Sequence, residues 1–336
     1  MGQISRRTLL GATLATPAFG QSRKPLLVEA FGGVYESTLR EKVIPDFEKQ
    51  HGYAVTLVVG DDPTVIPKIV AARNRPTYDV VALNNDSAIL LQTQGLFAPD
   101  QSAKLGNIGR VYGSMKPPAT ALYGMIIYEY ALVYNTKKLA AAPRSWMDLW
   151  TTDATVGVPH IGQSYGMTFL YLAALLHGGS ATNLGPGFEA IRKLRRYKVY
   201  KNVGQGLTMF QQGEIEVALY YGHRAQQMID LGFPIARVRP QEGVWGQRTG
   251  MQIPRTTTNL EGAVAWVDTT LGVAYQTAFA ELMYSPTNRD VVLPEALAAK
   301  HIMGEARVAA VQEPPWAELL PQRDALLDRW SREIGA

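Results

Sequence analysis

Short apolar runs alternate with helical periodicity along the first hundred residues. Three runs are typical of β-strands: 26–31, 54–59 and 78–83. Four apolar residues at intervals of four predict a helix after the first strand: Tyr35, Leu39, Val43 and Phe47. Asp61-Asp62-Pro63 marks a second helix start, and Asp86 is expected to cap a third helix over 87–94. This alternation predicts the α/β class, with a mainly parallel sheet covered on both faces.

A second series of strands and helices follows an extended segment at 125–135. Its predicted strands are 155–159, 215–221 and 235–238, and its predicted helices are 167–176, 188–197, 207–212 and 224–231. A helical region over 260–283 is expected to break at 270–272, and an amphipathic helix is expected at 323–334. Extended segments, with no low-complexity linker, join the two series. We therefore expect two α/β lobes that meet at a hinge.

The first twenty residues have the layout of an export signal. Arg6 and Arg7 precede a mildly apolar run that ends in small residues, with cleavage expected before Gln21. The Ser-Arg-Arg-x-Leu-Leu core resembles bacterial twin-arginine signals. The run is too short to span a bilayer, which needs about 20 apolar residues. We expect a soluble periplasmic protein after cleavage of the signal.

The composition and charge of the chain argue against several kinds of partner and site. Removing the two signal arginines lowers the formal net charge from +4 by two, and no basic run indicates a nucleic-acid partner. The chain has no cysteine, which excludes disulfides, thiolate zinc sites and a lipid-modified cysteine. The five histidines show no metal-ligand spacing, and no phosphate-binding loop or other cofactor motif is present. We therefore expect neither a metal nor a cofactor, and no catalytic residues.

Several segments, in order, resemble the polyamine-type periplasmic solute-binding proteins of ABC importers. They are Phe31-Gly32-Gly33-Val34-Tyr35, IPDFEKQHGYAVTLVVG (44–60), YDVVAL (78–83), YALVYNTKKL (130–139), PRSWMDLW (143–150), FQQGEIEVALYYG (210–222), PQEGVWGQRTGMQIPR (240–255) and LLDRWSREI (326–334). The Pro-x-Ser-Trp-x-Asp-Leu-Trp turn is the most specific of them. Together they cover nearly all of the chain after the signal.

The resemblance implies a type II periplasmic-binding fold, with two α/β lobes joined by crossing hinge strands around a central ligand cleft. Lobe one would comprise 25–133 plus 254–300, lobe two 134–253, and 301–336 would be a tail packed on the lobes. The protein would be a monomer, and it would not be an enzyme. It would capture a small polar ligand by hinge closure and deliver it to an inner-membrane ABC permease.

Candidate ligand-binding residues lie where the strands end or cross between the lobes, because open α/β sheets bind ligands at the carboxyl ends of their strands. In lobe one they are Phe31, Gly32, Gly33 and Asn85, and the resemblance adds Tyr128 and Glu129 on the crossing segment, where the family has cleft residues. In lobe two they are Ser164, Tyr165 and Arg224, with Gln247 on the return crossing, and the resemblance adds Tyr221 and Thr249. Asp86 is interpreted as a helix cap rather than a ligand carboxylate.

The return crossing departs from the polyamine binders, which carry an acidic residue where this chain has Thr249. A buried ammonium without a carboxylate partner is costly. Arg224 could clamp an acidic group in bidentate fashion. These residues favour an organic anion, an amino-acid-like zwitterion or an aminophosphonate, with a polyamine still possible.

Two other functions stay open at this stage. Gly162-Gln163-Ser164-Tyr165-Gly166 matches the G-x-S-x-G turn of serine hydrolases, and Asp268 or Asp290 with His301 would complete a triad. Tyr220-Tyr221 resembles the paired tyrosines of ferric-binding proteins of the same fold. However, adjacent residues of a strand point to opposite faces, so one of these two tyrosines is expected in the core.

Overall fold

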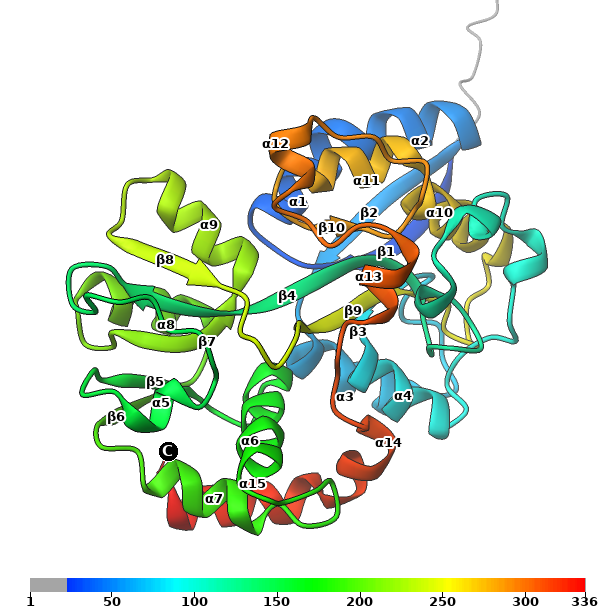
Figure 1. The fold of residues 1–336 in the computed structure, drawn as a ribbon. Coiled ribbons are helices and arrows are strands. Elements are labelled where there is room, and N and C mark those ends of the chain that lie inside the picture. Colours follow the sequence, from blue (N-terminus) through cyan, green and yellow to red (C-terminus); the bar gives the residue numbers. More distant parts are fainter. Residues whose placement is uncertain (1–22, 336) are drawn as a thin grey trace, which may run out of the picture.

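The computed structural model describes residues 23–335, and the export-signal prediction lies outside them. The described chain forms two α/β lobes, and one long strand, β4 (Tyr123–Asn135), runs from the first lobe into the second (Figure 1). Each lobe has its own buried apolar core. No helix within this range is long and apolar enough to cross a membrane.

Lobe one begins with the predicted strand–helix alternation. Its first strands are β1 (Lys24–Ala30), β2 (Tyr53–Val59) and β3 (Val81–Asn84). Its helices are α1 (Val34–Thr38), α2 (Ile44–His51), α3 (Asp62–Ala71), α4 (Asn85–Thr93), α10 (Leu260–Leu271), α11 (Val273–Ala280), α12 (Glu295–Ala298) and α13 (Glu305–Ala309). β1 and β2 pair in parallel along their whole length, and a parallel bridge between Val28 and Val80 links β1 to the start of the third strand. The predicted break in the long helical region occurs at Gly272.

The first predicted helix contains a π-helical turn at Leu39–Val43, between α1 and α2. Its apolar residues stand four apart, and each such step overshoots one α-helical turn by about 40°. The wider π turn corrects the drift. Tyr35, Leu39, Val43 and Phe47 are therefore all buried on one face.

Lobe two repeats the alternation. Its strands are β5 (Val156–Pro159), β6 (Tyr197–Tyr200), β7 (Val217–Tyr221) and β8 (Ile235–Val238). Its helices are α5 (Asp148–Thr151), α6 (Ser164–Leu176), α7 (Gly185–Arg192), α8 (Val203–Gln211) and α9 (Gly222–Asp230). β5 lies between β6 and β7 and is parallel to both. The predicted helix over 188–197 was too long: it ends at Arg192, and the aromatic and β-branched residues from Tyr197 onward form β6 instead.

Two long strands connect the lobes. The first half of β4 pairs with β9 (Trp245–Gln252) and β10 (Ser285–Pro286), and its second half pairs with β7 and β8. The buried side chains follow this division, because Ile126 belongs to the core of lobe one and Leu132 to the core of lobe two. β9 returns the chain to lobe one, where it pairs with β3.

The C-terminal segment crosses between the lobes a third time. Val311 lies in the core of lobe one, whereas Trp316 and Trp330 lie in the core of lobe two. This segment contains α14 (Trp316–Leu319), a short 3-10 turn at Leu320–Gln322, and α15 (Arg323–Glu333). α14 packs against α4 of lobe one and α15 against α7 of lobe two, so the tail spans the gap between the lobes (Figure 1).

Candidate functional site

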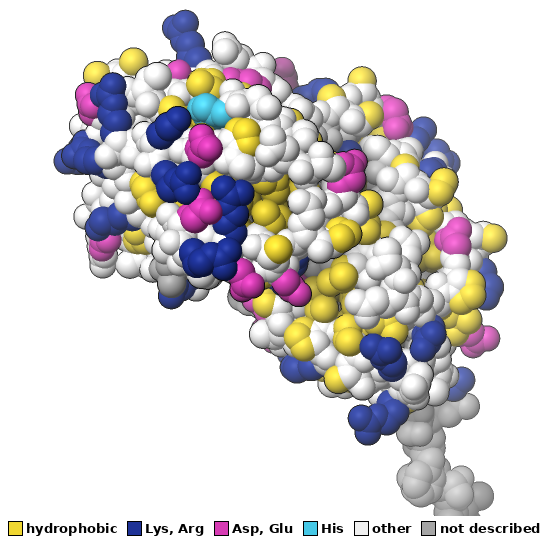
Figure 2. Space-filling model, turned by 90° about the horizontal axis from the view of Figure 1, so that it is seen from below, with side chains coloured by type: hydrophobic (Ala, Val, Ile, Leu, Met, Phe, Trp, Pro, Cys, Tyr) yellow, Lys and Arg dark blue, Asp and Glu magenta, His cyan; other side chains and the backbone are white. Residues whose placement is uncertain are grey.

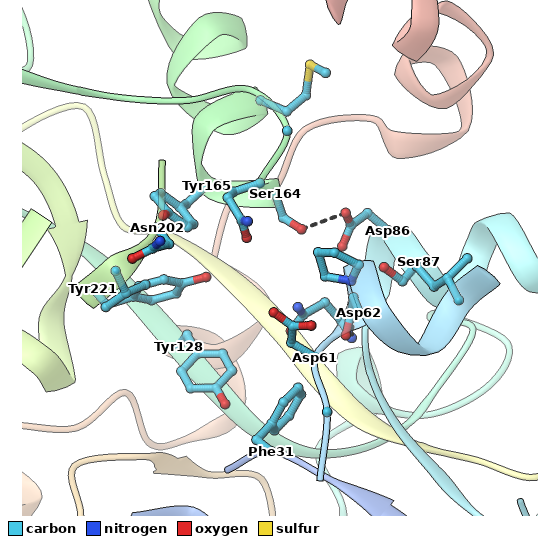
Figure 3. Close-up of a pocket in the computed structure, with 18 of the residues that line it drawn as sticks. Phe31, Asp61, Asp62, Asp86, Ser87, Tyr128, Ser164, Tyr165, Asn202 and Tyr221 are labelled. Carbon is cyan, nitrogen blue, oxygen red and sulfur yellow. Dashed lines mark hydrogen bonds between the residues drawn. The ribbon is translucent and has the colours of Figure 1, made fainter. Parts of the chain in front are cut away.

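A cavity of about 550 Å³ lies between the lobes. In lobe one it is lined by the turns that follow β1, β2 and β3, and in lobe two by the turns that follow β5, β6 and β7. These are the carboxyl ends of the strands, the place where open α/β sheets bind ligands. Side chains from both lobes point into the space between them (Figure 3).

Three aspartates form an acidic wall on the lobe-one side: Asp61, Asp62 and Asp86. Asp61 caps α3, where it accepts a hydrogen bond from the backbone N–H of Thr64. Asp62 is 6% exposed, and its Oδ1 has no hydrogen-bond partner in the structure. Burial, reinforced by the nearby charge of Asp86, raises the pKa of Asp62 to about 7. The other oxygen of this carboxyl group, Oδ2, accepts a hydrogen bond from the backbone N–H of Asn84 at 3.2 Å, so Asp62 is half satisfied.

Asp86 holds the two lobes together across the cleft. Its carboxylate accepts a hydrogen bond from Ser164 Oγ of lobe two at 2.7 Å, drawn as the dashed line in Figure 3. It also accepts one from Nε2 of Gln247 on the hinge strand β9 at 3.1 Å. Burial raises the pKa of Asp86, while the bonds from Ser164 and Gln247 oppose that shift.

The lobe-two side has the opposite electrostatic character. Three helices begin at the cavity without an acidic residue in their first turns: α6, α8 and α9. Free N–H groups and the helix dipole make such ends favourable for anions. Arg224 lines the cavity in the first turn of α9, and its guanidinium donates to the neutral amide oxygen of Gln227 at 3.1 Å. Within residues 23–335, Arg224 has no carboxylate partner.

Aromatic rings surround the remaining space. Tyr128 stands at the centre, with ring centroids 5.5 Å from Tyr221 and 5.4 Å from Tyr284. His223 lies 5.0 Å from Tyr128, and burial together with Arg224 holds its pKa well below the usual value, so the ring is neutral. Phe31 lies on the lobe-one side of this group (Figure 3). These rings offer apolar faces to a ligand and carry no charge at neutral pH.

The structure brings seven of the twelve candidate residues to the cavity wall: Phe31, Gly32, Tyr128, Ser164, Tyr165, Tyr221 and Arg224. Gly32 is required by packing, because a Cβ there would lie 2.9 Å from a methyl carbon of Val59. Tyr128 and Tyr221 come from neighbouring strands, β4 and β7, which explains their proximity.

The other five candidates do not line the cavity: Gly33, Asn85, Glu129, Gln247 and Thr249. Glu129 points to the opposite side of β4 from Tyr128, as strand alternation requires, and forms salt bridges with Arg237 and Arg239. Asn85 bonds to Glu313 of the tail, away from the cleft.

The remaining three of these five have structural roles close to the cavity. Gly33 precedes α1 with φ at 71°, a conformation that favours glycine. Thr249 is fully buried and donates to the side-chain oxygen of Asn84 at 2.9 Å. Gln247 lies beneath the cavity and accepts hydrogen bonds from the hydroxyls of Tyr130 and Tyr221, while its amide supports Asp86.

Sequence reasoning missed the acidic wall. Asp61 and Asp62 were assigned only to a helix start, and Asp86 only to a helix cap. The cap position of α4 is in fact Asn84, and Asp86 sits inside the first turn with its carboxylate in the cavity. Carboxylates are therefore present, supplied by lobe one rather than by the return crossing. The available signal was an aspartate two residues after the end of each of two strands, β2 and β3.

The serine-hydrolase alternative is wrong. Ser164 is bonded to Asp86, whereas His301 is fully buried with Nδ1 3.4 Å from Ser285 Oγ. Asp268 bonds to Asn107 and Asp290 pairs with Arg110, so the proposed triad is not assembled.

The ferric-iron alternative is not supported either. Tyr220 is buried and donates to the backbone oxygen of Val203, so only Tyr221 of the pair reaches the cavity. Residues 23–335 contain no cluster of three or more histidine or carboxylate side chains placed to hold a metal ion.

Comparison with known proteins places the chain among binding proteins. The sequence model described as bacterial extracellular solute-binding protein matches residues 42–305. A γ-aminobutyric acid-binding protein of Pseudomonas aeruginosa is 28% identical over 184 residues, which are 54% of this chain and half of that protein. A 2-aminoethylphosphonate-binding periplasmic protein of Salmonella typhimurium is 24% identical over 355 residues, covering 98% of both chains.

A solved structure shows the same fold. An ABC transporter protein from Clostridium perfringens superposes with a TM-score of 0.78 at 21% identity, covering 92% of this chain and 99% of that one. The predicted two-lobed fold and the resemblance to solute-binding proteins are confirmed. The relatives are named as binding proteins, which agrees with the absence of an assembled triad. The chain belongs to the family of bacterial extracellular solute-binding proteins.

Proposed function

We propose that the protein binds a zwitterion with separated charges, an ω-amino acid or an aminophosphonate, and delivers it to an ABC permease. The observation that carries this proposal is the opposite charge of the two cavity walls. Lobe one contributes the carboxylates of Asp61, Asp62 and Asp86. Lobe two contributes three acid-free helix starts and the guanidinium of Arg224, which has no carboxylate partner within residues 23–335.

A zwitterion satisfies both walls at once. Its ammonium would meet the partnerless Oδ1 of Asp62, and its acidic group would meet Arg224. A diamine would place its second ammonium on the side of Arg224, and a simple acid would leave Oδ1 of Asp62 without a partner. The two curated relatives are named for γ-aminobutyrate and 2-aminoethylphosphonate, and each compound has an amino group separated from an acidic group.

Thermal unfolding in the presence of five compounds, namely two zwitterions, butylamine, butyrate and putrescine, tests the charge requirement. γ-Aminobutyrate and 2-aminoethylphosphonate should raise the midpoint, because a ligand at about 100 times its Kd stabilises the folded state by about 2.7 kcal/mol. Butylamine and butyrate each satisfy one wall only and should act weakly. A midpoint raised by putrescine but by neither zwitterion would refute the proposal.

Arg224→Ala tests whether Arg224 contacts the acidic end of the ligand. Loss of a charged hydrogen bond of about 1.5–3 kcal/mol should weaken γ-aminobutyrate binding by about 10- to 150-fold in titration calorimetry. Weak butylamine binding should not fall, because that compound has no acidic group. Arg192→Ala, on the outer face of lobe two, is the matched control and should bind as the unsubstituted protein does. Equal affinities of the Arg224 variant and this control would remove Arg224 from the site.

The same proposal includes the division of the chain and its location. We propose that 25–133 with 254–300 moves as one body against 134–253, and that the tail 301–336 joins them. We further propose that the protein acts as a monomer in the periplasm after a twin-arginine signal is removed. The division is supported by the two cores and by the exchange of partners along β4.

A further inference from the structure

The lining of the cavity changes from acidic to apolar one helical turn beyond the aspartates. Asp62 of α3 is followed at i+4 by Ile66, and Asp86 of α4 is followed at i+4 by Leu90; all four line the cavity. Residues four apart lie on the same face of a helix, about one turn or 5.4 Å further along. In lobe two, Met167 follows Ser164 at i+3 along α6, a spacing that also keeps both residues on one face of the helix. The acidic wall therefore continues into an apolar zone.

The C-terminal segment closes this apolar zone. Its lining residues are Trp316 and Leu319 of α14, Leu320 of the following turn, and Arg323 at the start of α15. α14 packs against α4, the helix that also supplies Asp86 and Leu90. Seen from below, hydrophobic side chains gather in the hollow between the lobes, while Lys, Arg, Asp and Glu cover the adjoining surface of lobe two (Figure 2).

The closing segment is firmly anchored on both sides. Glu313 forms a salt bridge of 2.6 Å with Arg248 of the hinge strand β9 and accepts a hydrogen bond from Asn85 of lobe one. On the other side, Trp330 of α15 is fully buried in the core of lobe two. Because both ends are held, Leu319 and Leu320 present a defined wall rather than a loose flap.

The cavity leaves room for a ligand larger than γ-aminobutyrate. Its volume is about 550 Å³. γ-Aminobutyrate has seven non-hydrogen atoms and leaves much of that space unfilled. Water in the apolar zone gains few hydrogen bonds, whereas an alkyl group gains about 0.8 kcal/mol for each buried methylene. An apolar extension of the ligand is the chemistry that fits.

We propose that Ile66, Leu90, Met167, Trp316, Leu319 and Leu320 form a separate alkyl subsite beside the acidic wall. This subsite binds an alkyl substituent on the amino group of the ligand. The C-terminal segment limits how long that substituent can be. The preferred ligand is then a zwitterion with a substituted ammonium rather than a bare ω-amino acid. This inference rests on the proposed function, because the ammonium at the aspartates places the substituent.

Calorimetry with γ-aminobutyrate and its N-methyl, N-propyl and N-hexyl derivatives tests the subsite. Each methylene that enters should tighten binding by up to about 4-fold, and the gain should stop when the chain reaches the wall. Leu320→Phe should shorten the longest chain that still gains affinity, and Leu320→Ala should lengthen it. In both variants the change in affinity should be largest for the N-hexyl derivative and smallest for γ-aminobutyrate.

Leu327→Ala provides the matched control, because Leu327 packs on the same core from α15 but does not line the cavity. It should leave the whole series unchanged. N-alkyl derivatives that bind no tighter than γ-aminobutyrate would overturn the subsite, and so would a Leu320→Phe variant that weakens every compound equally. If the unsubstituted protein binds none of the compounds, the proposed function itself fails, which is a different result from a flat series.

Discussion

Two buried carboxyl groups near the cavity oppose folding at neutral pH. Glu29 is fully buried behind the acidic wall; its Oε2 accepts from the backbone N–H of Ala82, and its Oε1 has no partner. Burial raises its pKa to about 8, and burial raises that of Asp62 to about 7. The unfolded values are about 4.3 and 3.9, so the folded protein retains protons that the unfolded chain releases. The contribution of these two groups to the free energy of unfolding is therefore most favourable below about pH 4, and it falls as the pH rises towards 7–8.

Asp62→Asn should stabilise the protein at pH 8 and abolish ligand binding. The neutral amide removes an ionisation penalty of at most about 4 kcal/mol. The gain should be small near pH 4, where Asp62 is protonated in the folded protein and about half protonated in the unfolded chain. Glu29→Gln should give a similar stability profile with binding intact, because Glu29 does not line the cavity. Urea unfolding at pH 4 and pH 8 measures both variants. An Asp62→Asn variant less stable than the unsubstituted protein at pH 8 would contradict this account.

At the scale of elements, a buried ion pair between Glu313 and Arg248 anchors the C-terminal segment to the hinge strand β9. The Glu313–Arg248 pair is nearly enclosed, with side-chain exposures of 5% and 15%. By contrast, Lys42 and Glu281 form an exposed pair, with exposures of 50% and 54%. Removing one partner of a buried ion pair leaves the other charge uncompensated, which costs about 3–5 kcal/mol, whereas an exposed pair contributes at most about 1 kcal/mol.

Glu313→Ala should therefore lower the free energy of unfolding by several kcal/mol, and Glu281→Ala should change it by about 1 kcal/mol or less. Denaturant titration of the two variants in parallel provides the comparison. If both variants unfold at the same denaturant concentration as the unsubstituted protein, the C-terminal segment is not held by the Glu313–Arg248 pair.

The elements also show what sequence could and could not predict. Apolar periodicity located most strands and helices, because each buries one face or one run. It failed at Tyr197, where a strand follows the basic segment 193–196, and it could not reveal the π turn at Leu39–Val43. Tyr128 and Tyr221 were predicted from the resemblance to solute-binding proteins. The positions of Asp86 and Asn85 depended on which way each side chain turns, and local sequence does not determine that.

At the scale of the whole molecule, ligand binding is expected to bring the lobes together. The Ser164–Asp86 contact already joins them at one point, and a ligand that pairs with both walls would favour closure. Small-angle X-ray scattering should give a smaller radius of gyration with saturating γ-aminobutyrate or 2-aminoethylphosphonate than without. Butyrate at the same concentration should have little effect. Superimposable curves with and without a bound zwitterion would show that binding does not close the cleft.

The third crossing constrains what kind of movement the lobes can make. Two adjacent strands, β4 and β9, act as a flexible ribbon and alone would permit both bending and twisting between two rigid bodies. A tail held at Glu313 on one side and at Trp330 on the other adds an attachment away from that ribbon. We expect this third attachment to restrict twisting between the lobes, so that closure would bring the two charged walls together in a reproducible register.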